Sequence, residues 1–161
     1  MKLKKILMVF GTRPEAIKMI PLYLELQKNN TNIEAKICVT AQHRNMLDQV
    51  LDFFQVTPDY DLNLMRPNQN LYQLTSDIIL NMKNVLEEYQ PDLVLVHGDT
   101  TTSMAVSIAA FYAGSKIGHV EAGLRTFNRY APFPEEMNRN LTAKLSNFHF
   151  APTDISKNNL L

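Results

Sequence analysis

The sequence predicts an α/β fold in which a doubly wound parallel sheet carries helices on both faces. Two observations point to it. Short apolar runs, such as residues 5–10 (KILMVF) and 93–96 (LVLV), are typical of strands that are buried on both faces. Longer amphipathic stretches separate these runs along the chain. Because parallel strands need long crossover connections, this alternation indicates a parallel sheet with helical crossovers.

Turn residues and apolar spacing mark the first two strand–helix units. A strand over residues 5–10 ends at the turn GTRP, and a helix over 15–28 follows. A second strand is expected over 33–39 and a second helix over 42–54. Helical periodicity predicts which side chains face the core. They are Ile17, Met19, Ile20, Tyr23 and Leu24 in the first helix, and Met46, Leu47, Val50 and Phe54 in the second.

The middle of the chain begins with a loop rich in Pro, Asn and Asp over residues 57–70, which is expected to hold a short third strand at 61–64. The longest helix is expected over 71–89. A fourth strand over 93–96 follows Pro91, and the small residues over 103–113 predict a helix that packs tightly on the sheet.

The last part of the chain completes the sheet. A strand over 116–120, a helix over 134–145 and a strand over 148–151 are expected. Residues 152–154 (PTD) have the form of a helix start, yet the chain ends at Leu161. We therefore expect the native chain to continue.

Composition limits the function classes. The chain has 161 residues, the length of one domain, and its 16 basic residues balance 16 acidic ones. The absence of a basic excess argues against nucleic acid as a partner. No apolar run approaches the ~20 residues that span a bilayer, so no membrane partner is expected. The single cysteine, Cys38, cannot form an internal disulfide, which fits a cytoplasmic protein.

Ligands of an open parallel sheet bind beyond the carboxyl ends of its strands. Cations, carboxylates and histidines follow four of the predicted strands, and this convergence predicts acid–base chemistry on an anionic small molecule. These residues are Arg13 and Lys18 after the first strand, Gln42, His43 and Arg44 after the second, His97 and Asp99 after the fourth, and His119, Glu121, Arg125, Glu135 and Glu136 after the fifth.

Each of these residues also has a structural interpretation. Arg13 and Lys18 are either solvated charges or an anion site beside a helix start. Asp99 is suited to a helix cap, and Glu121 to an ion pair with Arg125. One carboxylate at the start of the 134–145 helix is expected to act only on the helix dipole.

The histidines and the cysteine are expected to be structural. His97, His119 and His149 fit hydrogen-bonded histidines packed at strand ends better than metal ligands, and Cys38 fits an inert core position. The five glycines form neither G-x-G-x-x-G nor a P-loop, and no His/Cys cluster has zinc spacing. No metal or cofactor is therefore expected.

Five blocks carry a resemblance to a known family. Residues 11–22 (GTRPEAIKMIPL) resemble the opening signature of the non-hydrolysing UDP-N-acetylglucosamine 2-epimerases. Residues 40–44 (TAQHR) are similar to that family's T-G-Q-H-R segment, with Ala41 in place of the usual glycine. Three further family blocks follow in order at residues 97–100 (HGDT), 119–126 (HVEAGLRT) and 134–139 (PEEMNR). The resemblance covers the whole chain.

The resemblance implies a Rossmann-like domain over residues 1–161, the N-terminal half of a two-domain glycosyltransferase-B-like fold. By the same resemblance, the C-terminal nucleotide-binding domain of that fold is expected to be absent from this chain. It also implies a homodimer that inverts carbon 2 of the UDP-sugar by eliminating UDP to a 2-acetamidoglucal and adding it back. The alternatives are a glycosyltransferase of the same fold and a non-catalytic fragment that binds a nucleotide sugar.

The same resemblance assigns roles to residues of this chain. It implies three catalytic carboxylates, Asp99, Glu121 and Glu135. It implies substrate binding by Arg13, Lys18, His97, Arg125 and Arg139, and an allosteric site for a second substrate molecule at Gln42, His43 and Arg66.

Overall fold

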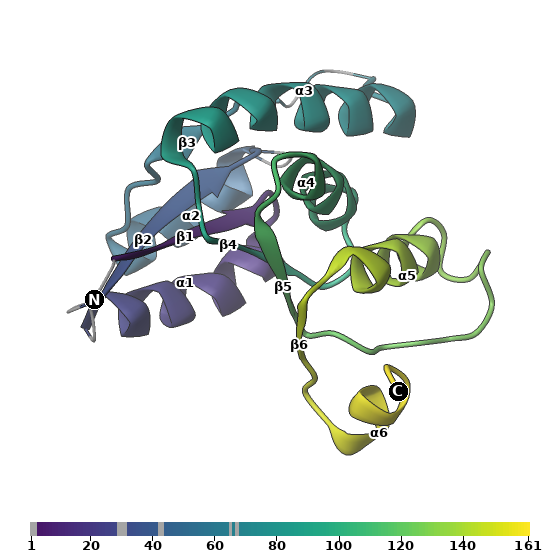
Figure 1. Ribbon diagram of the computed structural model, residues 1–161. Helices are drawn as coiled ribbons and strands as arrows, with labels where there is room; N and C mark the ends of the chain where they lie inside the picture. The colour runs from purple at the N-terminus through teal and green to yellow at the C-terminus, as the bar shows by residue number, and fades with distance from the viewer. Residues whose placement is uncertain (1–2, 29–31, 42–43, 65, 67) are drawn as a thin grey trace.

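The computed structural model describes residues 3–28, 32–41, 44–64, 66 and 68–161, and it contains a six-stranded sheet (Figure 1). Every pair of neighbouring strands is parallel, in the order β3-β2-β1-β4-β5-β6. The strands are β1 Lys4–Phe10, β2 Ile33–Val39, β3 Tyr60–Asp61, β4 Leu93–His97, β5 Lys116–Val120 and β6 Phe148–Phe150. The predicted α/β doubly wound parallel sheet is therefore confirmed, and its strand order is that of a Rossmann-like fold.

Helices cover both faces of the sheet. Figure 1 shows α3 and α4 above the sheet and α1 below it, while α6 lies apart at the end of the chain. None of the described helices is long and apolar enough to cross a membrane. The helices are α1 Arg13–Lys28, α2 Arg44–Phe54, α3 Leu71–Tyr89, α4 Thr101–Tyr112, α5 Glu135–Leu145 and α6 Asp154–Asn158.

Strand β1 has two buried faces, which accounts for its continuously apolar sequence. Met8 and Phe10 pack with residues of α1 and α2, whereas Leu7 and Val9 pack with residues of α3 and α4. The alternation of a strand sends neighbouring side chains to opposite faces. One apolar run therefore joins both halves of the core.

The switch point of the sheet lies between β1 and β4. From β1 the chain winds outward through α1 to β2, and after α3 it returns to place β4 on the other side of β1. The helices that follow these two strands, α1 and α4, therefore begin side by side at the carboxyl edge. In a doubly wound sheet this crevice is where ligands bind.

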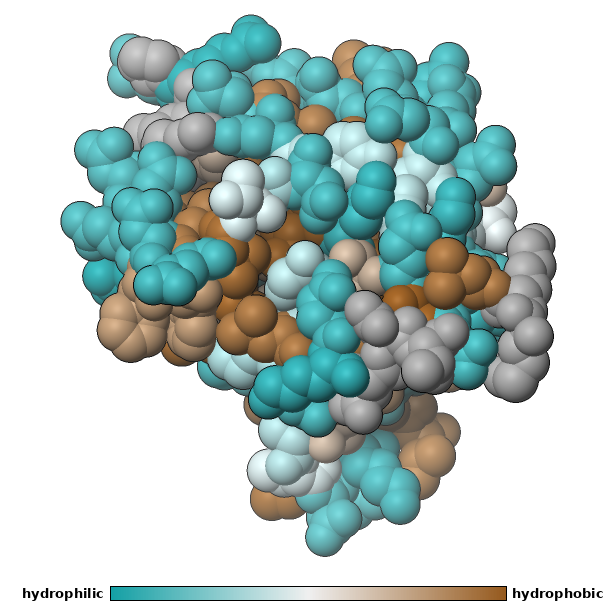
Figure 2. All heavy atoms as spheres, turned by 90° about the vertical axis from the view of Figure 1, so that its left-hand side faces the viewer, coloured by the Kyte–Doolittle hydropathy of each residue, from teal (hydrophilic) through white to brown (hydrophobic). Residues whose placement is uncertain are grey.

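The opposite edge of the sheet carries structural charges. Figure 2 shows this end of the molecule, where hydrophilic residues surround patches of hydrophobic ones. Here Lys4 and Asp92 form an exposed ion pair of 2.9 Å at the amino ends of β1 and β4. Such an exposed pair contributes little to stability, about 0–1 kcal/mol.

Some predicted details are wrong. Ile17 and Met46 are 50% and 43% exposed, because the buried stripes contain their neighbours, Ala16 in α1 and Leu47 in α2, about 100° away around each helix. The third strand lies at Tyr60–Asp61 rather than at 61–64. Helix α4 begins two residues before the predicted position, because the side chain of Thr100 caps it by accepting a hydrogen bond from Ser103 N (3.0 Å).

Candidate functional site

A buried carboxylate, Glu15, holds the two sides of the switch point together. Its Oε2 accepts hydrogen bonds from the backbone N–H groups of Gly11 (3.0 Å) and Thr12 (2.7 Å), in the turn after β1. Its Oε1 accepts one from Thr100 Oγ1 (2.7 Å), at the start of α4. Glu15 is 1% exposed, so water does not compete for these bonds. Sequence reasoning missed this residue, although its place three residues after Thr12 is that of a helix-capping glutamate.

Lys18, His97 and Glu121 form a cluster at the carboxyl edge of the sheet. Lys18, one turn into α1, donates a hydrogen bond from Nζ to Glu121 Oε2. The same carboxylate oxygen lies 3.5 Å from His97 Nε2, at the end of β4. The predicted ion pair between Glu121 and Arg125 is therefore wrong, because Glu121 pairs with Lys18. The ion pair with Lys18 joins residues 103 positions apart, which no local spacing reveals.

The carboxyl group of Glu121 is kept ionised. Burial raises its pKa, but the hydrogen bond and charge of Lys18, together with His97, outweigh burial and hold the pKa below its ordinary value. Its backbone has a φ of 62°, in the left-handed region that non-glycine residues rarely adopt. This conformation directly after β5 turns the chain at the edge of the sheet. A strained backbone at such a position is common in functional sites.

Asp99 forms a second carboxylate–cation pair. Arg139, on α5, donates a hydrogen bond from its guanidinium to Asp99 Oδ2. Asn138 Nδ2 donates to the backbone carbonyl of Asp99 (3.0 Å). The interpretation of Asp99 as a helix cap is wrong, because Thr100 is the cap of α4. Helix α5 thus fixes Asp99 at the end of β4.

Of the two carboxylates that open α5, Glu136 has the structural role. Its two oxygens accept hydrogen bonds from Thr126 N (3.0 Å) and Phe127 N (3.2 Å). Burial raises the pKa of Glu136, but these backbone bonds and the one from Asn140 outweigh burial and leave the pKa below its ordinary value. Glu135 is half-buried and forms no hydrogen bond or ion pair with the described residues. It is therefore the carboxylate that remains available to a ligand.

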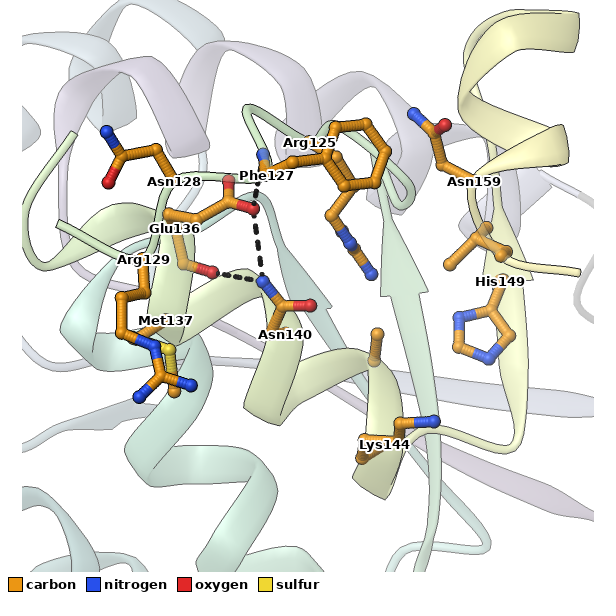
Figure 3. A pocket seen from close by; sticks show the side chains of 12 residues that line it. Arg125, Phe127, Asn128, Arg129, Glu136, Met137, Asn140, Lys144, His149 and Asn159 are labelled. Atoms are coloured by element: carbon orange, nitrogen blue, oxygen red, sulfur yellow. Dashed lines mark hydrogen bonds between the residues drawn. The ribbon is translucent and has the colours of Figure 1, made fainter. Parts of the chain in front are cut away.

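Arg125 does not join the cluster around Glu121. Its side chain points into a cavity bounded by α5, β6 and the end of α6 (Figure 3). Arg13 is exposed at the first residue of α1, where it has no partner among the described residues. The structure therefore forms two groups, Lys18 with His97 and Glu121, and Asp99 with Arg139, and Arg13 belongs to neither.

The histidines depart from the expectation of fully hydrogen-bonded side chains. His119 Nε2 lies 2.6 Å from the carbonyl of Gly98, so this nitrogen carries the proton, while buried Nδ1 has no partner in the described structure. Burial lowers the pKa of His119 to about 4. His97 Nε2 is buried without a hydrogen-bond partner of normal length. His149, by contrast, is exposed on β6.

The remaining predicted residues lie elsewhere or outside the structure. Gln42 and His43 fall outside the described residues, and Arg66 is an exposed residue that lines a separate cavity beside the start of α3. Ala41 has a φ of 53°, which accounts for the glycine that the resembled family has at this position. Cys38 is buried in β2, and burial raises the pKa of its thiol, as expected of inert core. The described residues contain no His/Cys/Asp/Glu cluster that could hold a metal ion.

Comparison with known proteins supports the resemblance. Residues 25–161 match the family described as UDP-N-acetylglucosamine 2-epimerase. Over 157 residues the chain is 64% identical to a UDP-N-acetylglucosamine 2-epimerase of Neisseria meningitidis serogroup A and 59% identical to one of Escherichia coli K12. Each match covers 98% of this chain but only 42% of the relative. The chain therefore spans about two fifths of the length of these relatives.

Solved structures have the same fold. The crystal structure of UDP-GlcNAc 2-epimerase from Neisseria meningitidis bound to UDP-GlcNAc matches with a TM-score of 0.93 at 63% identity. The enzyme from Methanocaldococcus jannaschii in complex with UDP-GlcNAc and UDP matches with a TM-score of 0.89 at 38% identity. Each match covers 97% of this chain and 42% of the solved chain.

Proposed function

Because the chain belongs to the UDP-N-acetylglucosamine 2-epimerase family, we propose that it forms the N-terminal Rossmann-like domain of an enzyme that interconverts UDP-N-acetylglucosamine and UDP-N-acetylmannosamine. A second, nucleotide-binding domain would complete the site in a glycosyltransferase-B-like arrangement. The share of the relatives that the chain spans, 42%, supports this division. Two of the similar structures are described as complexes with UDP-GlcNAc, which supports the substrate class.

The observation that carries the proposal is the pair of carboxylates at the switch point, each held by a cation. Glu121 is paired with Lys18, and Asp99 with Arg139. Epimerisation at carbon 2 needs a base on one face of the sugar and an acid on the other. It also needs positive charge for the departing diphosphate. Both requirements match the side chains gathered at this edge.

The reaction follows from these groups. A carboxylate removes the proton from carbon 2, the bond from carbon 1 to the UDP oxygen breaks, and a double bond forms between carbons 1 and 2. Lys18 and Arg13 stabilise the negative charge of the leaving UDP. A carboxylic acid then returns a proton to the other face of carbon 2 while UDP adds back to carbon 1. No atom or electron pair is lost, so the step needs no cofactor.

The lowered pKa of Glu121 keeps its carboxyl ionised near neutral pH, which is the state a base needs, while it also weakens the affinity of the carboxylate for the proton. Asp99 and Glu135 are the candidates for the acid. Ionised Glu121 is also placed between Lys18 and His97, so proton removal changes the charge of an existing cluster rather than of an isolated buried group. His97 and Arg139 belong to the proposed substrate-binding set, and so, by the resemblance, does Arg125, whose side chain faces the cavity beside α5.

Further properties implied by the resemblance also belong to the proposal. A second substrate molecule would act as an activator at Gln42, His43 and Arg66, of which Arg66 lines the cavity at the start of α3. A homodimer is consistent with the exposed apolar side chains Leu80 of α3 and Tyr112 of α4, which line a common cavity. We propose a cytoplasmic location, where nucleotide sugars are used.

Proton exchange at carbon 2 tests the function directly. UDP-N-acetylglucosamine is incubated in heavy water with this chain, and with the same chain followed by its second domain, and proton NMR follows the carbon 2 signal. We expect deuterium to enter only with the longer protein, and Glu121→Gln to abolish it while Glu25→Gln does not. Binding without exchange by both proteins would support the non-catalytic fragment, and transfer that requires an acceptor would support the glycosyltransferase.

A further inference from the structure

A cavity of about 910 Å³ lies beside α5 on the side away from Asp99. Asn138 and Arg139 of α5 contact Asp99, whereas Asn140 and Lys144, four residues apart on the same helix, face the cavity (Figure 3). Asp99 and the open space of the cavity therefore lie on different sides of α5, and Arg139 lies between them, in contact with both Asp99 and Glu136. Its volume is within the range of small-molecule sites.

The cavity is electropositive. Its walls carry Arg125 and Lys144, with the titratable ring of His149 beside them. Glu136 is the only carboxylate among the described residues that line it, and both of its oxygens already accept hydrogen bonds from backbone N–H groups. Neither Arg125 nor Lys144 forms an ion pair with a described residue. The cavity thus holds positive charge that the described protein groups do not neutralise.

Arg125 is the central cation. Its side chain is half-buried and projects between Asn140 and His149 into the open space (Figure 3). Within the described structure its guanidinium donates one hydrogen bond, from Nη1 to the carbonyl of the neighbouring Leu124 (2.8 Å). Burial lowers the pKa of the guanidinium, and the nearby charge of Arg139 lowers it further against the opposing effect of Glu136. A half-buried guanidinium with free donors is a site for a planar or tetrahedral oxyanion.

We propose that this cavity binds the phosphate group of a nucleoside monophosphate, with Arg125 as the bidentate donor and Lys144 as the second cation. The amide group of Asn159, in the segment after α6, provides a further donor, since only one of its two hydrogens is used in the bond to the carbonyl of Gly123. Donors that arrive from three separate elements suit the several oxygens of a phosphate better than the two of a carboxylate. This site is independent of the proposed epimerase activity.

Phe127 supplies the contact for the base. Its ring is 80% exposed and lies at the rim of the cavity beside Arg125 (Figure 3). Its backbone has a φ of 60° and is held there by the hydrogen bond from Phe127 N to Glu136. An exposed aromatic ring next to a cation offers a stacking face for a flat base.

Two histidines allow the two sites to be observed separately. His149 lines the cavity, while His97 lies beside Glu121 at the switch point. Adenosine 5′-monophosphate is added to the 161-residue chain at constant ionic strength, and the ring protons of both histidines are followed by NMR. We expect a saturable shift of the His149 signal while the His97 signal stays in place. The proposed function is tested separately by adding UDP-N-acetylglucosamine in place of adenosine 5′-monophosphate. A shift of the His97 signal without a shift of the His149 signal would support it.

Charge-neutral variants identify the ligands. Arg125→Gln should weaken binding of adenosine 5′-monophosphate about tenfold or more, which is the usual cost of a lost charge-assisted bond. Lys83→Gln, which removes an exposed charge on α3, should change it less than twofold. If Arg125→Gln does not fold, Lys144→Gln tests the same site. Lys144 is exposed, so its replacement should weaken binding without disturbing the fold. An unchanged affinity in both cavity variants, or a His149 shift that does not saturate, would overturn the proposal.

The base contact is tested by comparing two probes. Inorganic phosphate should bind at His149 more weakly than adenosine 5′-monophosphate. Phe127→Ala should bring the two affinities together, because the backbone bond to Glu136 is retained while the ring is lost. Equal affinities of phosphate and adenosine 5′-monophosphate for the original chain would overturn the assignment to a nucleoside monophosphate.

Discussion

Thr100 Oγ1 donates a hydrogen bond of 2.7 Å to Glu15 Oε1, although the two residues are 85 positions apart in the sequence. Glu15 also accepts the backbone N–H groups of the turn after β1, and Thr100 caps α4. One buried carboxylate therefore connects the first turns of α1 and α4 across the switch point. Lys18 lies in α1 and Asp99 lies just before α4, so the positions of both side chains depend on this connection.

Replacement of Glu15 by alanine is expected to destabilise the fold. The variant leaves three donors without their charged acceptor in a buried site, and we expect the free energy of unfolding to fall by about 3 kcal/mol. Urea denaturation followed by circular dichroism measures it. The matched control is Glu25→Ala, because Glu25 is exposed and should cost about 0.5 kcal/mol or less. Equal losses in the two variants would contradict the role of Glu15.

Replacement of Lys18 by glutamine is expected to raise the pKa of the Glu121 carboxyl. Burial raises this pKa, whereas the hydrogen bond and charge of Lys18 lower it. Without Lys18 the effect of burial is larger relative to the remaining effects, so the pKa rises. The carboxyl carbon shift of Glu121, followed against pH by NMR, reports it. Lys28→Gln, which removes a cation paired with Glu25, should leave the Glu121 curve in place. A curve that does not move in Lys18→Gln would show that the ion pair is absent in solution.

Stability is expected to fall as the pH falls from about 6.5 to 4. In the folded protein His119 remains neutral down to about pH 4, whereas in the unfolded chain it binds a proton near pH 6.5. The unfolded state therefore binds more protons in this window, and the free energy of unfolding falls by about 3 kcal/mol across it. Glu121 and Glu136, whose pKa values are lowered, add to the loss only below their ordinary values near pH 4.5.

The variant His119→Gln isolates this effect. Urea denaturation at several pH values should give a smaller slope of stability against pH between 6.5 and 4.5 than in the original chain, since one titrating group has been removed. The same slope in both proteins would mean that folding does not lower the pKa of His119.

Gly123→Ala is expected to release α6. Gly123 has a φ of 90°, and a Cβ at this position would collide with the backbone carbonyl of Ser156. Asn159 Nδ2 also donates to the carbonyl of Gly123 (2.9 Å), so a shift of this turn breaks that bond. We expect trypsin to cleave after Lys157 at least tenfold faster, as mass spectrometry can follow, because local unfolding of the helix exposes the site.

Gly114→Ala is the control for that experiment. Gly114 also has a positive φ, of 74°, but a Cβ there meets no atom within 4 Å. It should therefore cost only backbone strain, about 1 kcal/mol, without faster cleavage at Lys157. Equal cleavage rates in the two variants would show that the contact with Ser156 does not hold α6.

Much of the fold was predictable because it depends on local pattern. The bounds of α3, β2 and β5 agree with the predicted ranges, since their apolar spacing and the flanking turn residues are contained in short stretches of sequence. The exposed Ile17 shows the limit of this reasoning. Periodicity gives an apolar stripe, but the part of the stripe that is buried depends on how the helix rests on the sheet.

The residue types of the candidate site were also predictable, because polar side chains that follow buried strands gather at one edge of a parallel sheet. Their pairing was not. Either Lys18 or Arg125 could have formed an ion pair with Glu121. Arg125 is closer in the sequence, yet Lys18 is the partner. The choice depends on the order of the strands, which is a property of the whole sheet.

The sequence by itself determined the fold class, the edge at which chemistry collects and the family to which the five blocks belong. Only the tertiary structure decided that Lys18 pairs with Glu121, that Arg139 pairs with Asp99, and that Arg125 faces a separate cavity. The physical reason is that strand and helix patterns are local. An ion pair forms between side chains that the folded sheet and its helices bring together, whatever their separation along the chain.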